Sequence, residues 1–335
     1  MEKRKPATIR DHSIDNIRFI LIFLVVFAHL LEVPTSFGGR IVIYKFIYSF
    51  HLPAFLFLFG YNAKFSLKRI IFRWCIPYVI FQCVYLLFVK YVLKTGVTFQ
   101  FKTPFWLLWY MMVSIYYQLL LPILDKANKP AQVLLLGGSF VLAILIGKVD
   151  SIGYDLSLSR AIVLLPWFML GFFCKKNQVL RLVERHRAVC LSASAACAMI
   201  MASLASYVKY LPYGILYSCL SYAAGDGTMR MRAAVFVMSA SAIVILFLGI
   251  KPYLNREIPV ITYIGKNTWP VFLLHGFIVK TIQTYYPEIV SPPIRLFLIT
   301  SVILLLLGNK FCSNAIYYAC FSWLEKIRIK KGTEK

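Results

Sequence analysis

Long apolar stretches separated by short polar connections follow one another along the whole chain. A helix rises about 1.5 Å per residue, so about 20 apolar residues cross the hydrocarbon core of a bilayer. The stretches predicted to cross it are residues 17–33, 41–60, 70–93, 105–124, 131–147, 160–174, 187–206, a stretch that ends near 250, 262–282 and 294–320. The connections are too short to hold an extramembrane domain, so any chemistry is expected in or beside the helices.

Basic residues lie in alternate connections, and this alternation predicts the orientation. The N-terminal tail, the connections at 64–73, 125–130 and 175–187, and the tail at 325–335 are all rich in Lys and Arg. Because connections rich in Lys and Arg stay in the cytoplasm, both termini are expected there. That requires an even number of spans.

The segment 211–225 (LPYGILYSCLSYAAG) is apolar but short, and Pro and Gly lie near its ends. Counting it as a separate span would place the basic C-terminal tail outside the cell. We therefore interpret it as a broken or re-entrant segment that leads into the eighth span. Such backbone is tolerated at membrane depth where it is buried in protein or lines a wet cavity.

These patterns predict an all-α fold, a polytopic membrane helix bundle of about ten transmembrane helices with both termini cytoplasmic. One membrane domain is expected over residues 1–335, with a cytoplasmic N-terminal tail at 1–16 and a basic cytoplasmic C-terminal tail at 325–335. Composition agrees, since 60% of the residues are hydrophobic and the mean hydropathy is +0.73. Soluble domains are nearer half apolar.

The net charge of +24 would suggest a nucleic-acid partner in a soluble chain. Here the basic residues lie in the connections, where they orient the protein and attract anionic membrane lipids or an anionic ligand. We expect no nucleic-acid partner. The eight cysteines include no C-x-x-C pair and show no metal-ligand spacing, so neither a disulfide framework nor a metal site is expected.

The first apolar stretch holds the strongest candidate chemistry, within DNIRFILIFLVVFAHLLE at 15–32. His29 and Glu32 are three residues apart and share a helical face, and Arg18 lies about 16 Å before His29 along the axis. Ionisable groups in a membrane helix usually face a polar interior. His29 could act as a general base oriented by Glu32, with Arg18 holding an anionic group. Alternatively, His29 is a packed histidine bonded to a neighbouring helix, and Arg18 is an anchor at the membrane surface.

The same stretch resembles the first span of the acyltransferase-3 family of membrane acyltransferases. That family has an R-x10-H pattern in its first helix, matched here by Arg18 and His29. Its glycan O-acetylase branch often reads V-V-F-G-H followed by an acidic residue. Here Ala28 replaces the glycine, and Glu32 fits the acidic position.

Two further stretches resemble the family. Residues 50–61 (FHLPAFLFLFGY) are similar to its F-H-M-P-L-F-F-F-x-S-G-Y stretch and contain His51, which is either a wall of the site or a satisfied histidine at a helix end. Residues 68–78 (KRIIFRWCIPY) match a basic pair, commonly R-x-x-R in the family. Arg69 and Arg73 are spaced one residue wider but still share a helical face. They suit a phosphate, since guanidinium binds such oxygens bidentately, or they are only a basic cluster that orients the protein.

Two weaker matches follow. Residues 106–122 resemble the family's W-F-L span, where Trp109 and Tyr110 either line the site or anchor the helix at the membrane surface. Residues 263–279 resemble its Y-I-G-K-x-S-L-x-I-Y-L-L-H stretch and place His275 in a membrane helix, facing either the site or a neighbouring helix.

Prolines in two of these stretches predict bends. Pro53 and Gly60 bracket a segment expected to depart from a straight helix, and Pro270 is expected to kink its span.

The resemblance implies an O-acyltransferase in the bacterial inner membrane, crossing it many times. It implies acetyl-CoA as the donor, presented from the cytoplasm, and a cell-surface glycan or lipid-linked glycan as the acceptor. The implied donor ligands are Arg18, Arg69 and Arg73, and the implied catalytic pair is His29 with Glu32. The residues implied to contact substrate are His51, Trp109, Tyr110 and His275.

The main alternative is a transporter or flippase for a polar lipid or glycan. Polar residues inside the bundle and the broken segment at 211–225 also fit that function. A regulatory or sensory membrane domain is a third possibility, and it would need a partner.

Overall fold

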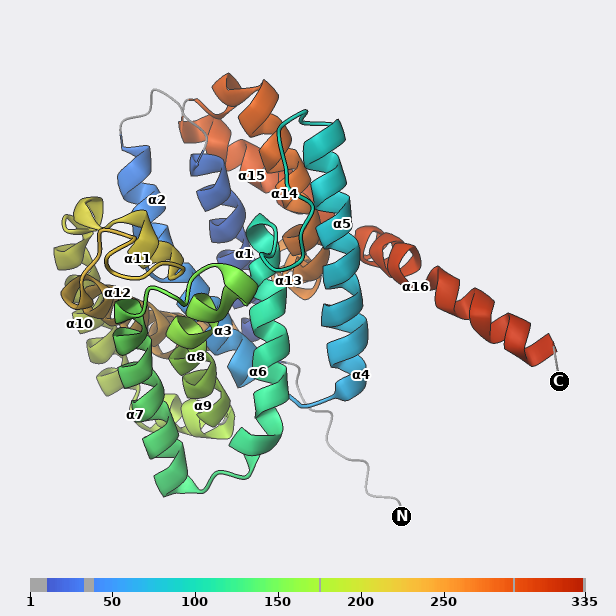
Figure 1. The fold of residues 1–335 in the computed structure, drawn as a ribbon. Helices are drawn as coiled ribbons and strands as arrows, with labels where there is room; N and C mark the ends of the chain where they lie inside the picture. Colours follow the sequence, from blue (N-terminus) through green and yellow to red (C-terminus); the bar gives the residue numbers. More distant parts are fainter. Residues whose placement is uncertain (1–10, 33–38, 175, 292, 334–335) are drawn as a thin grey trace, which may run out of the picture.

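The computed structural model describes residues 11–32, 39–174, 176–291 and 293–333, and all regular structure within them is helical. Figure 1 shows the helices side by side in a bundle, with α16 leaving it on one side. The helices are α1 Ser13–Leu31, α2 Arg40–Tyr48, α3 His51–Tyr61, α4 Leu67–Arg69, η1 Ile70–Cys75, α5 Ile76–Tyr91, α6 Trp109–Asp125, α7 Lys129–Leu145, α8 Leu158–Phe173, α9 Lys176–Arg185, α10 Arg187–Ala205, α11 Tyr213–Tyr217, α12 Met229–Val244, α13 Pro259–Lys266, α14 Thr268–Tyr285, α15 Pro293–Leu307 and α16 Lys310–Thr333.

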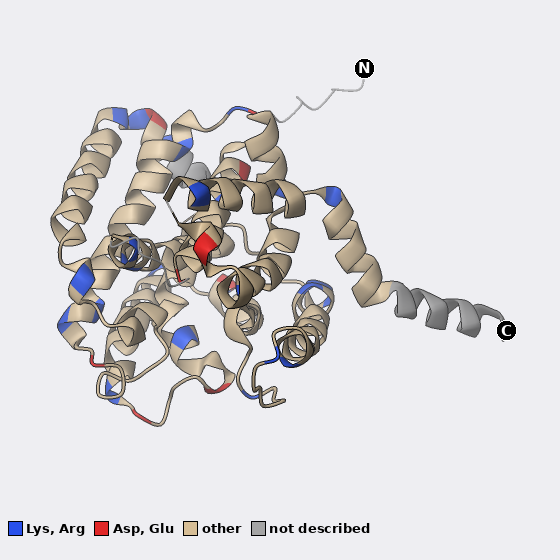
Figure 2. Cartoon of the chain, turned by 90° about the horizontal axis from the view of Figure 1, so that it is seen from above, with Lys and Arg blue, Asp and Glu red and all other residues tan. Residues whose placement is uncertain are grey.

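The structure confirms a polytopic helical membrane bundle. Within the described ranges, eight helical stretches are long and apolar enough to span a bilayer, and α15 with the first part of α16 makes nine if that bent pair is one span. Helix α14 has 18 residues, which rise about 27 Å, and it packs against α1 and α15. The predicted count of about ten is therefore not reached by length and composition within the described residues, because α14 is too polar along its length to pass the same test. Figure 2 shows few acidic positions on a ribbon with many basic ones.

The prediction of one continuous span at 294–320 is wrong, because the chain bends by 60° between α15 and α16. Asn309 accounts for the new helix start. Its side-chain oxygen accepts a hydrogen bond from the backbone N–H of Cys312 at 2.9 Å, as a helix-capping residue does.

The bends predicted from prolines are also misplaced. Helix α3 is continuous past Pro53 and Gly60, and the break in that span lies at Ser49 and Phe50, upstream of α3. Likewise α13 ends before Asn267, and Pro270 lies in the first turn of α14. A proline in the first turn removes no intrahelical hydrogen bond, so the chain breaks before the proline and not at it.

Gly60 instead serves a close contact between α3 and α8. A Cβ atom at Gly60 would overlap the backbone carbonyl of Phe168, and one at Gly171 would overlap the backbone carbonyl of Phe57. The two glycines therefore let the two helices approach reciprocally.

We expect Gly60→Ala to destabilise the protein by about 1–3 kcal/mol, since backbone atoms of α8 must move. Thermal unfolding of the detergent-purified protein would show a lower midpoint. Gly138→Ala is the matched control, because nothing lies within 4 Å of its Cβ position. Equal midpoints for Gly60→Ala and Gly138→Ala would contradict this account of the α3–α8 contact.

Helix α1 begins at Ser13, within the stretch predicted as the N-terminal tail at 1–16, and residues 1–10 of that tail lie outside the described residues. The carboxylate of Asp11 accepts a hydrogen bond from Lys251 Nζ at 3.1 Å and is also bonded by Ser13. Partial burial raises the pKa of Asp11, but the Ser13 hydrogen bonds and the Lys251 charge lower it further, so the net shift is downward. The basic C-terminal tail was predicted at 325–335. Residues 325–333 belong to α16, and residues 334–335 lie outside the described residues.

The segment 211–225 is not a separate span, as predicted. Its helix α11 has five residues and ends at Tyr217, and the next residue, Ser218, has a φ of 55°. Tyr222 ties the segment to the α7 end, since its N–H donates to the Gly147 carbonyl at 2.6 Å and its hydroxyl donates to the Ile144 carbonyl at 2.7 Å.

Candidate active site

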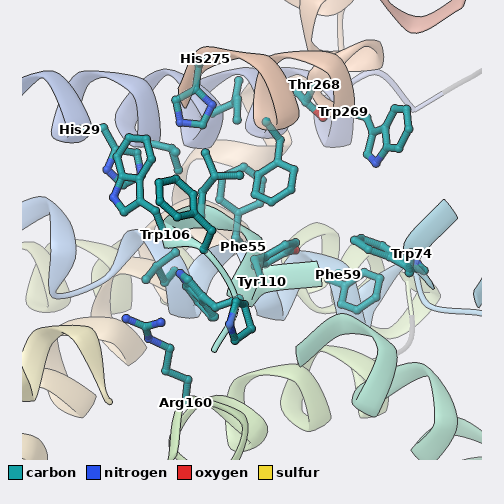
Figure 3. A pocket seen from close by; sticks show the side chains of 18 of the residues that line it. His29, Phe55, Phe59, Trp74, Trp106, Tyr110, Arg160, Thr268, Trp269 and His275 are labelled. Carbon is teal, nitrogen blue, oxygen red and sulfur yellow. The ribbon is translucent and has the colours of Figure 1, made fainter. Parts of the chain in front are cut away.

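A cavity of about 1050 Å³ lies inside the bundle. One end, here called the basic end, is lined by Arg18, Arg69 and Arg73. The other end, here called the histidine end, is lined by His29 and His275. Figure 3 shows Trp74 and Trp269 at one side of the view and His29, Trp106 and Arg160 at the other, with Phe55, Phe59 and Tyr110 between them.

All nine candidate residues from the sequence line this one cavity, although they come from five separate stretches of the chain. They are Arg18, His29, Glu32, His51, Arg69, Arg73, Trp109, Tyr110 and His275. The structure therefore brings the predicted set together. Their individual roles remain predictions.

The histidine end is built around the His29–Glu32 pair at the end of α1. His29 Nδ1 lies 3.0 Å from Glu32 Oε1. Tyr48 and Tyr44, one turn apart on α2, donate their hydroxyls to the same Glu32 oxygen at 2.9 and 3.1 Å. Tyr217 of α11 lies 2.6 Å from the Tyr44 hydroxyl. Since Tyr44 donates to Glu32, it is Tyr217 that donates to Tyr44.

This arrangement fixes the tautomer of His29. A carboxylate only accepts hydrogen bonds, so Nδ1 of His29 carries a proton and donates a hydrogen bond to Glu32. The other ring nitrogen, Nε2, then keeps its lone pair when the ring is neutral. The His29 side chain is 12% exposed and lines the cavity. The ring of Trp106 lies 4.6 Å from the imidazole, centroid to centroid. His29 can therefore act as a base towards a group bound in the cavity.

Two further histidines stand near His29. The His275 ring lies 5.5 Å from it, and His275 Nδ1 bonds the Val271 carbonyl of its own helix at 2.8 Å. The buried Nε2 of His275 has no hydrogen-bond partner among the described residues. His51 Nδ1 bonds the Ile47 carbonyl at 2.7 Å. His275 thus shows no bond to a neighbouring helix, and His51 is satisfied at a helix end while also lining the cavity.

The basic end gathers three arginines. Arg18 donates to Asp15 at 3.0 Å, and the Arg73 guanidinium lies 5.8 Å from the centroid of the Trp269 ring. Arg18 and Arg69 are near enough to Arg73 to act on it electrostatically. Residues Ile70–Cys75 form a π-helix, and both Arg69 and Arg73 still reach the cavity. Three guanidinium groups at one opening have the chemistry to bind a phosphate, as predicted, and that role stays a prediction.

Aromatic rings line the cavity between its two ends. The ring of Tyr110 lies 6.5 Å from those of Phe55 and Phe59 and 5.4 Å from that of Phe272. Trp109 is buried. Both Trp109 and Tyr110 therefore line the cavity inside the bundle, and the alternative of a surface anchor is not supported.

Sequence reasoning missed several residues of the histidine end: Tyr44, Tyr48, Trp106, Arg160, Tyr217 and Lys280. Lys280 carried a usable signal, because a lysine inside an apolar span usually serves a polar interior. Its Nζ lies 4.4 Å from the centroid of the Trp106 ring. The tyrosines carried no signal of their own, since 21 tyrosines are spread along the chain.

The described part of the chain contains no group of three His, Cys, Asp or Glu residues that could hold a metal ion. The arrangement joins a His–Glu pair, a passage lined by aromatic rings and an end with three arginines. In a comparison with known families, residues 11–308 match the acyltransferase domain of the acyltransferase-3 family. No curated protein and no solved structure is similar enough to count as a match.

Proposed function

The chain belongs to the acyltransferase-3 family of membrane acyltransferases, and from that premise we propose that it acetylates a glycan. The donor is acetyl-CoA, and the acceptor is a hydroxyl of a cell-surface glycan or its lipid-linked precursor, as in the glycan O-acetylase branch. One observation carries the proposal. A His–Glu pair stands at one end of a continuous cavity, and three arginines stand at the other.

The donor lies along the length of the cavity. Arg69, Arg73 and Arg18 bind the CoA phosphates at the basic end, and the pantetheine arm follows the aromatic passage beside Tyr110. Helix α1 is unbroken from Ser13 to Leu31, so Arg18 and His29 are about 16 Å apart along its axis. That separation suits an arm that carries a thioester from the phosphates to the base.

The chemical step uses His29 as the general base. Its Nε2 takes the proton of the acceptor hydroxyl while the oxygen attacks the thioester carbonyl. The tetrahedral intermediate collapses, the C–S bond breaks, and the CoA thiolate recovers the proton from the imidazolium. Glu32 holds the ring and stabilises the imidazolium. A general base of this kind contributes typically 10²–10⁴-fold.

The membrane setting follows the orientation expected from the sequence. Both termini and the basic end face the cytoplasm of a bacterial inner membrane, where acetyl-CoA is available. The basic connections contact anionic lipids of that leaflet.

The proposal is tested by following label from radiolabelled acetyl-CoA into glycan in membranes that contain the protein and in membranes that lack it. Labelled glycan that requires the protein and loses its label on mild alkaline ester hydrolysis is expected. Movement of a fluorescent lipid-linked glycan across vesicles without any label transfer would favour the transporter alternative and overturn the proposal.

We expect Glu32→Gln to lower kcat about 10- to 100-fold with the KM for acetyl-CoA unchanged. The amide replaces a charged partner of His29, and hydrogen bonds to charged groups are worth about 1.5–3 kcal/mol. Initial rates over a range of acetyl-CoA concentrations give kcat and KM separately. Glu288→Gln, at an exposed carboxylate, is the control. A raised KM with an unchanged kcat would show that Glu32 serves donor binding and not His29.

A further inference from the structure

The proposed mechanism gives no task to Arg160, a cation of the cavity wall. Arg160, near the start of α8, lines the cavity. Its Nε donates to the Tyr217 carbonyl at 3.0 Å. Its guanidinium lies 4.8 Å from the centroid of the Trp109 ring and 5.1 Å from that of Tyr154. Figure 3 shows it opposite His275 across the cavity. The guanidinium is thus held at a fixed place on the wall.

Arg160 has no acidic partner within the described ranges. The ion pairs there belong to Arg18, His29, Lys102, Lys251 and Lys266. The Tyr217 carbonyl accepts a hydrogen bond from Nε alone, so both terminal nitrogens of the guanidinium can still donate hydrogen bonds. Guanidinium binds carboxylate or phosphate through two parallel hydrogen bonds. A positioned guanidinium with free terminal donors is therefore suited to an anion in the cavity.

The anion would lie near the reacting hydroxyl. The backbone carbonyl of Tyr217 accepts a hydrogen bond from Arg160 Nε. The hydroxyl of the same tyrosine donates a hydrogen bond to the Tyr44 hydroxyl, which in turn donates one to Glu32. One tyrosine therefore joins the guanidinium to the hydrogen-bond network of the base. A saccharide that offers a hydroxyl to His29 can present a charged group to Arg160 from the same or the next sugar residue.

The charge balance at the histidine end points the same way. Arg160 and Lys280 are its two cations, and Glu32 is its carboxylate. That carboxylate already accepts from His29, Tyr44 and Tyr48. The carboxylate offsets only one of the two cations, Lys280, with which it interacts electrostatically. The positive charge of Arg160 is left over, and it favours an anionic occupant.

Arg232 shows how a structural arginine differs. It is buried, lies 4.6 Å from the centroid of the Tyr222 ring and donates to the Ala143 carbonyl at 3.1 Å. It does not line the cavity. Arg160 shares the aromatic contacts but faces an open space large enough for a sugar.

We propose that the acceptor is an acidic saccharide whose carboxylate or phosphate is bound by Arg160. This inference rests on the proposed function, because it describes the acceptor of the same site. It adds a specificity residue and a substrate class: a glycan that carries a uronic acid or a sugar phosphate beside the acetylated hydroxyl.

Binding without donor tests the proposal. Three oligosaccharides serve as probes, identical except that one residue is glucose, glucuronic acid or glucose 6-phosphate. Titration calorimetry with detergent-purified protein is expected to show about tenfold or tighter binding of an acidic probe than of the neutral one. Arg160→Gln removes that advantage and leaves the neutral probe unchanged. Arg187→Gln is the control, because Arg187 also stacks on a tyrosine, Tyr253, but lies outside the cavity.

Preference for the glucuronic acid probe identifies a carboxylate ligand, and preference for the phosphorylated probe identifies a phosphate. Arg160→Lys keeps the charge and is expected to keep part of the preference. For the wild type, the advantage of the acidic probe should shrink at high salt. Equal binding of acidic and neutral probes by the wild type, or an unchanged preference in Arg160→Gln, overturns the inference. Because no donor is present, failure of acetyl transfer would count against the proposed function and leave this result standing.

Discussion

His29→Ala is expected to lower acetyl transfer by about 10²–10⁴-fold, the contribution of a positioned general base. The imidazole Nδ1 is held by Glu32 at 3.0 Å, which leaves Nε2 as the free acceptor towards the cavity. Alanine removes the ring and with it the site that takes the hydroxyl proton. The measurement is transfer from radiolabelled acetyl-CoA to glycan in membranes with matched amounts of the variant and wild-type protein.

The control for this variant is His186→Ala, at an exposed histidine remote from the cavity, which is expected to keep full activity. CoA binding should persist in His29→Ala, because the basic end is untouched. Undiminished transfer in His29→Ala would remove His29 as the base and point to His51 or His275. Loss of both transfer and CoA binding would instead indicate a misfolded variant, and His29→Gln, of similar volume, would then be compared.

Arg73→Gln combined with Arg69→Gln is expected to raise the KM for acetyl-CoA by about 10- to 100-fold while kcat changes little. Each charge-assisted hydrogen bond to phosphate is worth about 1.5–3 kcal/mol, and the phosphates are bound equally in the ground and transition states. Both arginines line the cavity at the end away from His29. Initial rates over a wide range of donor concentrations give both constants.

A truncated donor makes this test specific to the phosphates. Acetyl-pantetheine lacks them, so the double variant and the wild type should use it with the same kcat/KM. Arg230→Gln, at an exposed arginine outside the cavity, is the control for loss of charge. Equal losses with both donors would mean that the two arginines support the fold of this region and do not hold the phosphates.

The helical elements were determined by the sequence alone. Each span follows from a run of apolar residues long enough for a bilayer, because a backbone in lipid must satisfy its hydrogen bonds internally. The His29–Glu32 pair was also predictable, since residues three apart in a helix share a face. The resemblance of Arg18, Arg69 and Arg73 to the family pattern likewise predicted the residues of the basic end.

The positions of the bends required more than the sequence. Pro53 and Pro270 mark where helices begin, but whether a proline kinks a helix or follows a break depends on where the neighbouring helices pack. The turn at Asn309 likewise lay inside an apolar run that read as one span.

Only the tertiary structure decided the composition of the histidine end. Tyr44, Tyr217 and Arg160 belong to three different helices, far apart in the chain, and they meet through α11. Helix faces that pack together are chosen by the fit of many side chains, so no local pattern marks these residues. The sequence determined the membrane helices and the local His–Glu pair, and packing between helices decided what surrounds that pair.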